Sequence, residues 1–204
     1  MRRTYHRYAR KISSIIIVLL FATSLWQLAA AGWIQGKALV AQQLLRYSWQ
    51  QTLSGKTTSA QNETTHKPWP WADTWPVAKL IVPQQQVEQI ILAGDSGSSL
   101  AFAPGYSLAG AAPNTAGTTV ISAHRDTHFQ FLDEVEIGDP VFIQTPGQKV
   151  RYRVYDRKIV DSKTYLVSPD SDVSTLILAT CYPFDAISSG GSLRYLVYAK
   201  RQPA

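Results

Sequence analysis

From Val77 to Ala199 the sequence is a succession of short apolar segments, most of them closed by proline, glycine or a polar turn. In Lys149–Tyr155 the apolar residues fall at every second position, which is the pattern of a half-buried strand. No long amphipathic helix interrupts the series, and this is typical of a compact antiparallel β-barrel or sandwich. The expected strands are Val77–Val82, Val87–Ala93, Thr118–Ser122, Pro140–Gln144, Lys149–Tyr155, Lys158–Val160, Leu176–Thr180 and Leu193–Ala199, with one helical turn in Phe129–Val135.

The N-terminal part has a different composition. Residues 1–11 hold five basic side chains, and residues 12–36 hold no charged residue at all. Ile12–Trp33 is long enough to cross a bilayer, which takes about 20 residues, and the basic flank predicts that the N-terminus stays in the cytoplasm. A cleaved signal peptide, with Ala29–Ala31 as the small-residue site, is the alternative. Both interpretations export the rest of the chain.

The remaining boundaries follow from composition. A juxtamembrane helix is expected over residues 34–53, a polar and then Pro/Trp-rich linker over 54–74, and the folded β domain over 75–204. After residue 11 the chain carries 15 basic and 14 acidic residues, so its basic pI is a property of the N-terminus. This distribution favours membrane orientation and argues against a nucleic-acid partner.

Cys181 is the only cysteine, so neither an intramolecular disulfide nor a cysteine-rich metal site can form. It closes the apolar run that begins at Ser174, and it therefore stands at the end of an expected strand. Strand ends suit reactive groups, because the strand fixes the position and the following loop admits a substrate. The alternative is that Cys181 fills space in the core as a small hydrophobic residue.

Two other residues occupy comparable places. His124 follows the strand Thr118–Ser122, and Arg194 lies at the start of the last strand. If these strands end on one rim of a barrel, thiol, imidazole and guanidinium converge there. Such a set suits acyl transfer, in which a thiolate attacks a carbonyl, an imidazole moves protons and a cation stabilises the oxyanion.

Other arrangements remain open from the residues alone. His128 could serve in place of His124, or His124, Asp126 and His128 could bind zinc. A further acidic cluster could hold calcium or form a solvated turn; it consists of Asp133, Glu134, Glu136 and Asp139.

The three motifs together resemble the sortases, membrane-anchored cysteine transpeptidases of the bacterial surface. Thr175–Cys181 is similar to the family's T-L-x-T-C signature, with an aliphatic residue in place of the first threonine. The segment around His124 resembles the histidine motif, with alanine where glycine is common, and Leu193–Tyr195 matches the arginine motif. Tyr182–Ile187 is similar to the segment after the cysteine in class D and in the sortases of Gram-negative bacteria.

This resemblance implies an eight-stranded β-barrel with short helices behind an N-terminal transmembrane helix. Cys181 would cleave an LPxTG-like sorting signal of a client protein between Thr and Gly, and an amine acceptor, such as a peptidoglycan precursor, would resolve the thioester. His124 would act as general acid and then base, Arg194 would hold the oxyanion, and Thr180 would help to position the substrate. No cofactor or metal is implied. The expected location is the inner membrane, in a single pass, with the catalytic domain in the periplasm.

Two rival enzyme classes are less well supported by the order of residues. Papain-like hydrolases place the cysteine before the histidine, and L,D-transpeptidases have histidine and glycine just before the cysteine, where this chain has Ala179 and Thr180. The non-enzymatic rival is an exported β domain that binds a partner and keeps Cys181 as a structural residue.

Overall fold

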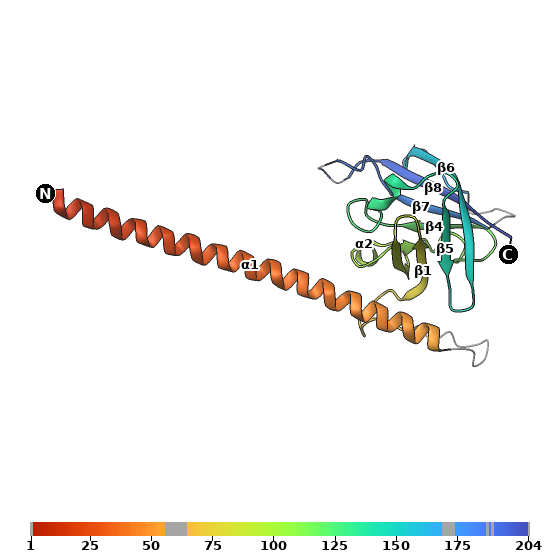
Figure 1. Ribbon diagram of the computed structural model, residues 1–204, viewed down its shortest axis with the longest axis horizontal. Coiled ribbons are helices and arrows are strands. Elements are labelled where there is room, and N and C mark those ends of the chain that lie inside the picture. Colours follow the sequence, from red (N-terminus) through yellow and green to blue (C-terminus); the bar gives the residue numbers. More distant parts are fainter. Residues whose placement is uncertain (1, 56–64, 169–173, 187, 189, 204) are drawn as a thin grey trace. The chain divides into compact units, whose positions relative to one another are not determined.

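The computed structural model describes residues 2–55, 65–168, 174–186, 188 and 190–203, with the side chains of residues 2–15 and Ile34 excepted. Its N-terminal element is one continuous helix, α1 (Arg2–Ser54) (Figure 1). The part of α1 from Ile16 onward is long and apolar enough to cross a membrane by length and composition. The chain divides after Gln42 into two compact units, and the second of these contains the last turns of α1 together with all the strands.

Eight strands close into a barrel in the order β1-β2-β3-β4-β7-β8-β6-β5, which confirms the eight-stranded barrel implied by the family resemblance (Figure 1). The strands are β1 (Pro76–Val82), β2 (Val87–Ala93), β3 (Gly105–Tyr106), β4 (Thr118–Ser122), β5 (Pro140–Gln144), β6 (Lys149–Asp161), β7 (Thr175–Cys181) and β8 (Leu193–Arg201). Two short helices accompany them, α2 (Gly97–Leu100) and the 3-10 turn η1 (Gln130–Glu134), which lies inside the expected helical turn.

The structure differs from the expected strand list in three respects. The two strands expected over 149–155 and 158–160 form one strand, β6, whose register against β8 shifts between Val154 and Asp156. Such a bulge interrupts the two-residue alternation without ending the strand. The two-residue strand β3 was not expected. In addition, β2 pairs with β3 and β4 pairs with β7 in parallel, so the expectation of an antiparallel barrel is wrong for these two pairs.

The barrel interior is filled by alternate residues of its strands, as the periodicity of β6 predicts. Val150, Tyr152 and Val154 point inward, and Tyr152 is almost fully buried. Leu176 and Leu178 of β7 belong to the same core. Residues of β7 at the intervening positions must therefore lie on the outer face of the barrel.

The end of α1 and the segment after it pack against the barrel unit. Leu45 is fully buried with Leu92 of β2 and Ala103. Ser48 donates a hydrogen bond to the carbonyl of His66. Within the expected linker over 54–74, residues 56–64 lie outside the described residues. The described remainder is held by the T-shaped contact of the Trp69 ring with Phe102 and by the buried hydroxyl of Thr74, which donates to the Ala93 carbonyl over 2.7 Å.

The helix contact gives a prediction for Leu45→Ala. Removing this buried side chain should lower the free energy of unfolding of the barrel unit by about 2–4 kcal/mol, because methyl groups are lost and a cavity remains. Urea unfolding of the full chain in detergent, followed by near-UV circular dichroism, measures the loss. Leu44→Ala is the matched control, since Leu44 is 37% exposed on the same helix. Equal losses in both variants would contradict a specific contact of Leu45 with the barrel.

Candidate active site

Strand β7, which ends at Cys181, lies between β4 and β8 (Figure 1). Cys181 is the direct cross-strand partner of Arg194 in the antiparallel β7–β8 pair. In the parallel β4–β7 pair, Ser122 is level with Ala179, and the backbone N–H of Ala123 donates to the Ala179 carbonyl. His124 follows two residues after Ser122, and Cys181 follows two residues after Ala179, so both come just after the last pair of these two strands.

The alternation of side chains places Cys181 and Arg194 on the outer face of the barrel. Ile177 and Ala179 of β7 belong to an apolar cluster outside the main core, together with Leu196 and Tyr198 of β8 and Val120 of β4. Cys181, Arg194 and His124 stand two or four residues beyond members of this cluster on the same strands or their extensions. Direct partners in an antiparallel pair share a face, so the Cys181 and Arg194 side chains project from the same surface.

Cys181 is partly exposed, and its neighbour Thr180 is buried. The Thr180 hydroxyl donates to the Ala123 carbonyl over 2.8 Å. This bond joins the residue before the cysteine to the residue before the histidine. The contact observed for Thr180 is thus on the inner side of the strand, with protein backbone.

His124 is exposed at the start of a short loop that the core holds in place. Its carbonyl accepts from the N–H of Phe129 over 2.9 Å, and the Phe129 ring is fully buried. His128 lies in the same loop, half-buried, and its carbonyl accepts from the Gln89 side chain. Burial lowers the pKa of the His128 imidazole below its usual range, and the charge of His124 lowers it further. The neutral form of His128 is therefore favoured.

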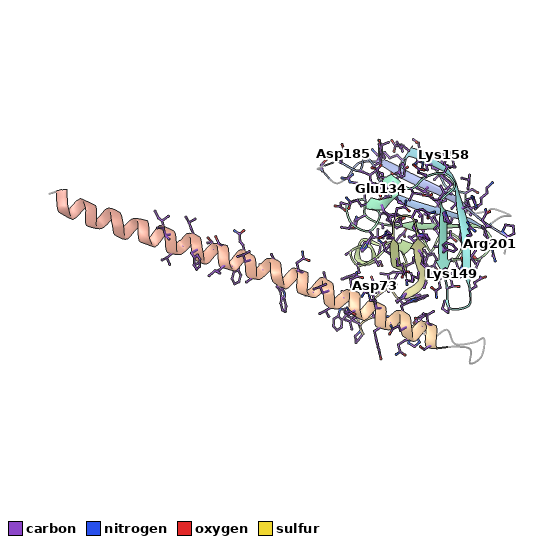
Figure 2. All side chains as sticks on the ribbon, viewed as in Figure 1. Asp73, Glu134, Lys149, Lys158, Asp185 and Arg201 are labelled. Atoms are coloured by element: carbon purple, nitrogen blue, oxygen red, sulfur yellow. The ribbon has the colours of Figure 1, made fainter. Side chains whose placement is uncertain are left out.

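Arg194 folds toward the loop that joins β7 to β8. Its Nη1 donates to the carbonyls of Gly191 and Leu193 over 2.7 and 2.9 Å. The Tyr182–Pro183 peptide bond in this loop is cis. The same loop packs on β8 through Phe184, whose ring lies edge-on to Tyr195 with 5.3 Å between centroids. Figure 2 shows Asp185 of this loop at the end of the barrel away from Lys149 and Arg201.

Arg125 is a contact residue that the sequence analysis did not single out. It follows His124, and its Nη2 donates to the carbonyls of Ala186 and Ser188 over 2.8 and 2.7 Å. These two carbonyls belong to the β7–β8 loop, so Arg125 joins the histidine loop to the loop that follows Cys181. Its position beside His124 was the only available signal, because backbone acceptors leave no mark in a sequence.

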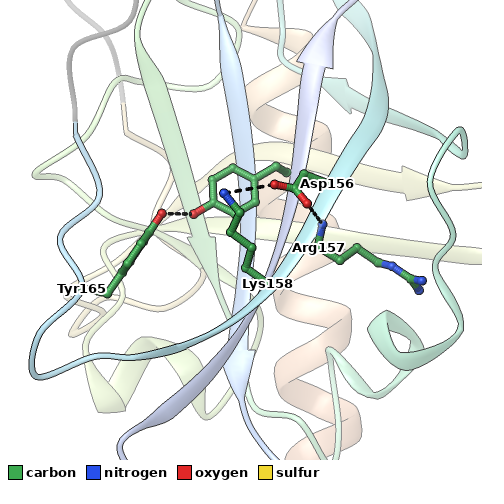
Figure 3. Close-up of polar contacts among 5 residues, drawn as sticks. Asp156, Arg157, Lys158 and Tyr165 are labelled. Carbon is green, nitrogen blue, oxygen red and sulfur yellow. Dashed lines mark hydrogen bonds and ion pairs between the residues drawn. The ribbon is translucent and has the colours of Figure 1, made fainter.

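The outer apolar face is covered in part by the segment between β6 and β7. The hydroxyls of Tyr165 and Tyr198 are 2.8 Å apart, and Val167 packs against the outer cluster. Figure 3 shows Tyr165 reaching this ring beside Lys158, whose ammonium group lies over the Tyr198 ring and forms an ion pair with Asp156. Burial raises the pKa of Tyr198, and the hydrogen bond to Tyr165 raises it further, so the phenol stays protonated at neutral pH.

Within the described part of the chain, no three His, Cys, Asp or Glu side chains come together in a way that could hold a metal ion. The geometry thus gives no support to a zinc site at His124, Asp126 and His128, or to a calcium site in the acidic cluster. In that cluster, the carboxylate of Asp139 accepts from the N–H of Glu136 across a turn.

A partly exposed thiol at the edge of a closed β-barrel, paired with an arginine and next to a strand that leads into a histidine, defines a candidate cysteine enzyme. The sequence model of the protein family described as "Sortase domain" matches residues 80–202 of this chain. Sortase D of Bacillus subtilis is 30% identical over 147 residues, which are 71% of this chain and 72% of that protein. The chain belongs to the sortase family, whose members are cysteine transpeptidases with an extracytoplasmic catalytic domain that act on sorting signals.

Solved structures share the fold. Sortase C1 of Streptococcus agalactiae is 26% identical with a TM-score of 0.57, over 63% of this chain and 68% of that one. Sortase D5 of Clostridium perfringens is 19% identical with a TM-score of 0.63, over 79% of this chain and 99% of that one. At 19% identity, the similarity to Sortase D5 shows a shared fold only.

Tyr165→Phe tests whether the segment between β6 and β7 is held on the outer face. Loss of the hydroxyl pair should lower the free energy of unfolding by about 0.5–1.5 kcal/mol and should speed amide exchange in residues 163–167. Tyr155→Phe is the control, because no hydrogen bond of the Tyr155 hydroxyl is found among the described residues. Unchanged exchange in Tyr165→Phe would mean that the tyrosine pair does not hold the segment.

Proposed function

We propose that this protein is a membrane-anchored sortase in which Cys181 cleaves an LPxTG-like sorting signal between Thr and Gly and transfers the acyl group to an amine. The proposal is supported by the register of β7, which pairs the only cysteine of the chain with Arg194 and pairs Ala179 with Ser122, two residues before His124. Cys181 is partly exposed, which argues against the alternative of an exported binding domain with a buried structural cysteine.

The chemistry assigns a role to each group. The Cys181 thiolate attacks the threonine carbonyl carbon, and the negative charge develops on the carbonyl oxygen. His124 gives a proton to the departing glycine amine, and the thioester remains. His124 then takes a proton from the acceptor amine, whose attack forms the new amide and releases the thiolate. Arg194 stabilises both oxyanions. Thr180 acts as a positioning residue through its bond to the Ala123 carbonyl.

The outer face of the barrel supports a peptide substrate. On this face, Ala179 lies two residues before Cys181 in β7, and Val120 of β4 pairs with Ile177, four residues before Cys181; Ala179 and Val120 are both partly exposed. They offer an apolar surface to the leucine and proline of an extended signal, and the peptide's threonine would then reach the thiol. The partners would be a client protein with this signal at its C-terminus and an amine acceptor, such as a peptidoglycan precursor.

The subgroup and location are proposed on several features. The 30% sequence identity to Sortase D of Bacillus subtilis supports membership of class D. The segment Tyr182–Ile187 supports class D or the sortases of Gram-negative bacteria. The basic residues before the apolar part of α1 support an N-terminus in the cytoplasm and a catalytic domain on the periplasmic side of the inner membrane. The domain plan comprises a tail (1–11), an anchor (12–33), a juxtamembrane helix (34–53), a linker (54–74) and the catalytic domain (75–204).

Cys181→Ala should keep the fold and lower acyl transfer by at least about 10³-fold, because no other thiol can form the thioester. The full chain in detergent is mixed with an LPxTG-type peptide and hydroxylamine, and mass spectrometry detects the peptide hydroxamate. Near-UV circular dichroism of both proteins controls for folding. Product formation by the variant at the wild-type rate would exclude Cys181 as the nucleophile.

Arg194→Lys should keep the charge and lower kcat by about 10²–10³-fold with little change in KM, since lysine lacks the planar fork of N–H donors. The hydroxamate assay at varied peptide concentration separates the two parameters. A near-normal kcat would show that Arg194 serves only to hold the carbonyls of Gly191 and Leu193.

A further inference from the structure

The Arg125 side chain takes no part in the proposed chemistry, yet it makes two short hydrogen bonds beside the site. Both come from one nitrogen, Nη2, and both end on carbonyls of the β7–β8 loop, those of Ala186 and Ser188. A cationic donor makes stronger hydrogen bonds to carbonyls than a neutral one does. Arg125 thus joins the loop that carries His124 to the loop that follows Cys181.

The β7–β8 loop has arginine contacts in its middle and at its end near β8. Arg194 donates to the carbonyls of Gly191 and Leu193 at the end near β8. Arg125 donates to the middle of the loop, at Ala186 and Ser188. Ala186, one of its two acceptors, has only a long backbone hydrogen bond of 3.4 Å to the Pro183 carbonyl in the described part of this loop. The contacts of Arg125 are therefore well placed to fix the middle of the loop.

We propose that Arg125 is a positioning residue of the transpeptidase reaction, which holds the His124 loop and the β7–β8 loop at the separation that the reaction requires. This inference rests on the proposed function. The strand register fixes the backbones of β4 and β7, but His124 and the β7–β8 loop lie beyond the strand ends. A small displacement of reacting groups can lower a rate by about 10²-fold. The hydrogen bonds of Arg125 connect the two loops and so restrict such a displacement.

The chemistry of the contact sets Arg125 apart from Arg194. Because one nitrogen makes both bonds of Arg125, the ammonium group of a lysine has enough N–H donors to replace it, although its side chain is shorter. Arg125→Lys should therefore retain much of the activity that Arg125→Ala loses. The same exchange at Arg194 should not be tolerated.

The test uses the full chain in detergent with the LPxTG-type peptide and hydroxylamine. Arg125→Ala should lower kcat about 10- to 100-fold with KM within about 3-fold, and Arg125→Lys should lie within about 5-fold of the wild type. The matched control is Arg153→Ala, which removes an exposed arginine of β6 and should leave kcat unchanged. Circular dichroism confirms that each variant is folded.

A second readout does not depend on turnover. Amide exchange at Ala186 and Ser188 should be faster in Arg125→Ala than in the wild type, and near the wild-type rate in Arg125→Lys. Unchanged exchange, or an Arg125→Ala variant with normal kcat, would overturn the proposal. If the wild type forms no hydroxamate, the proposed function is contradicted. Faster amide exchange in Arg125→Ala would in that case still support the contact between the two loops.

Discussion

The parallel pairing of β4 with β7 is the constraint on which the site depends. Two parallel strands end at the same edge of a sheet, whereas consecutive antiparallel strands end at opposite edges. The pairing therefore brings the residues after Ser122 and Ala179 together, although η1, β5 and β6 separate them in sequence. A shift of one residue in β7 would turn Cys181 into the core and Thr180 outward. The packing of Leu176 and Leu178 in the barrel core and of Ile177 in the outer cluster resists this shift, because each side chain would leave the contacts that its size and shape fit.

Because its side chains alternate between the two faces of the sheet, strand β7 contributes both to the barrel core and to the outer face of the barrel. Its inward residues, such as Leu178, complete the barrel core, and its outward residue Ile177 lies in a second apolar cluster with Leu196. A barrel face turned to water is usually polar, so this second apolar cluster must be shielded from water by another part of the chain. The segment with Tyr165 and Val167 provides part of it. This arrangement leaves the outer positions nearer the strand end, at Ala179 and Cys181, only partly covered.

Local pattern was enough to predict most strands, with Cys181 at the end of one strand and Arg194 at the start of another. It failed where distant parts of the chain decide the outcome. The division of β6 was wrong because its bulge at Val154 to Asp156 is set by pairing with β8. The parallel pairs were not predicted because periodicity carries no information on direction. The loop contacts of Arg125 and the pairing of Tyr165 with Tyr198 could not be predicted, since their partners are fixed only by the closed barrel.

Arg194 and Arg125 both hold the β7–β8 loop, and only Arg194 is also proposed to stabilise the oxyanion. The number of N–H donors on a guanidinium group allows both roles in one side chain. A guanidinium group has five N–H donors. Arg194 uses Nη1 for the carbonyls of Gly191 and Leu193, and its side chain shares the outer surface with Cys181. Under the proposed function, this one side chain would both support the loop and stabilise the oxyanion. Arg125 donates to the same loop at Ala186 and Ser188. The loop is therefore not held by Arg194 alone, so the proposed catalytic role of Arg194 does not depend on its contacts with the loop being the only ones.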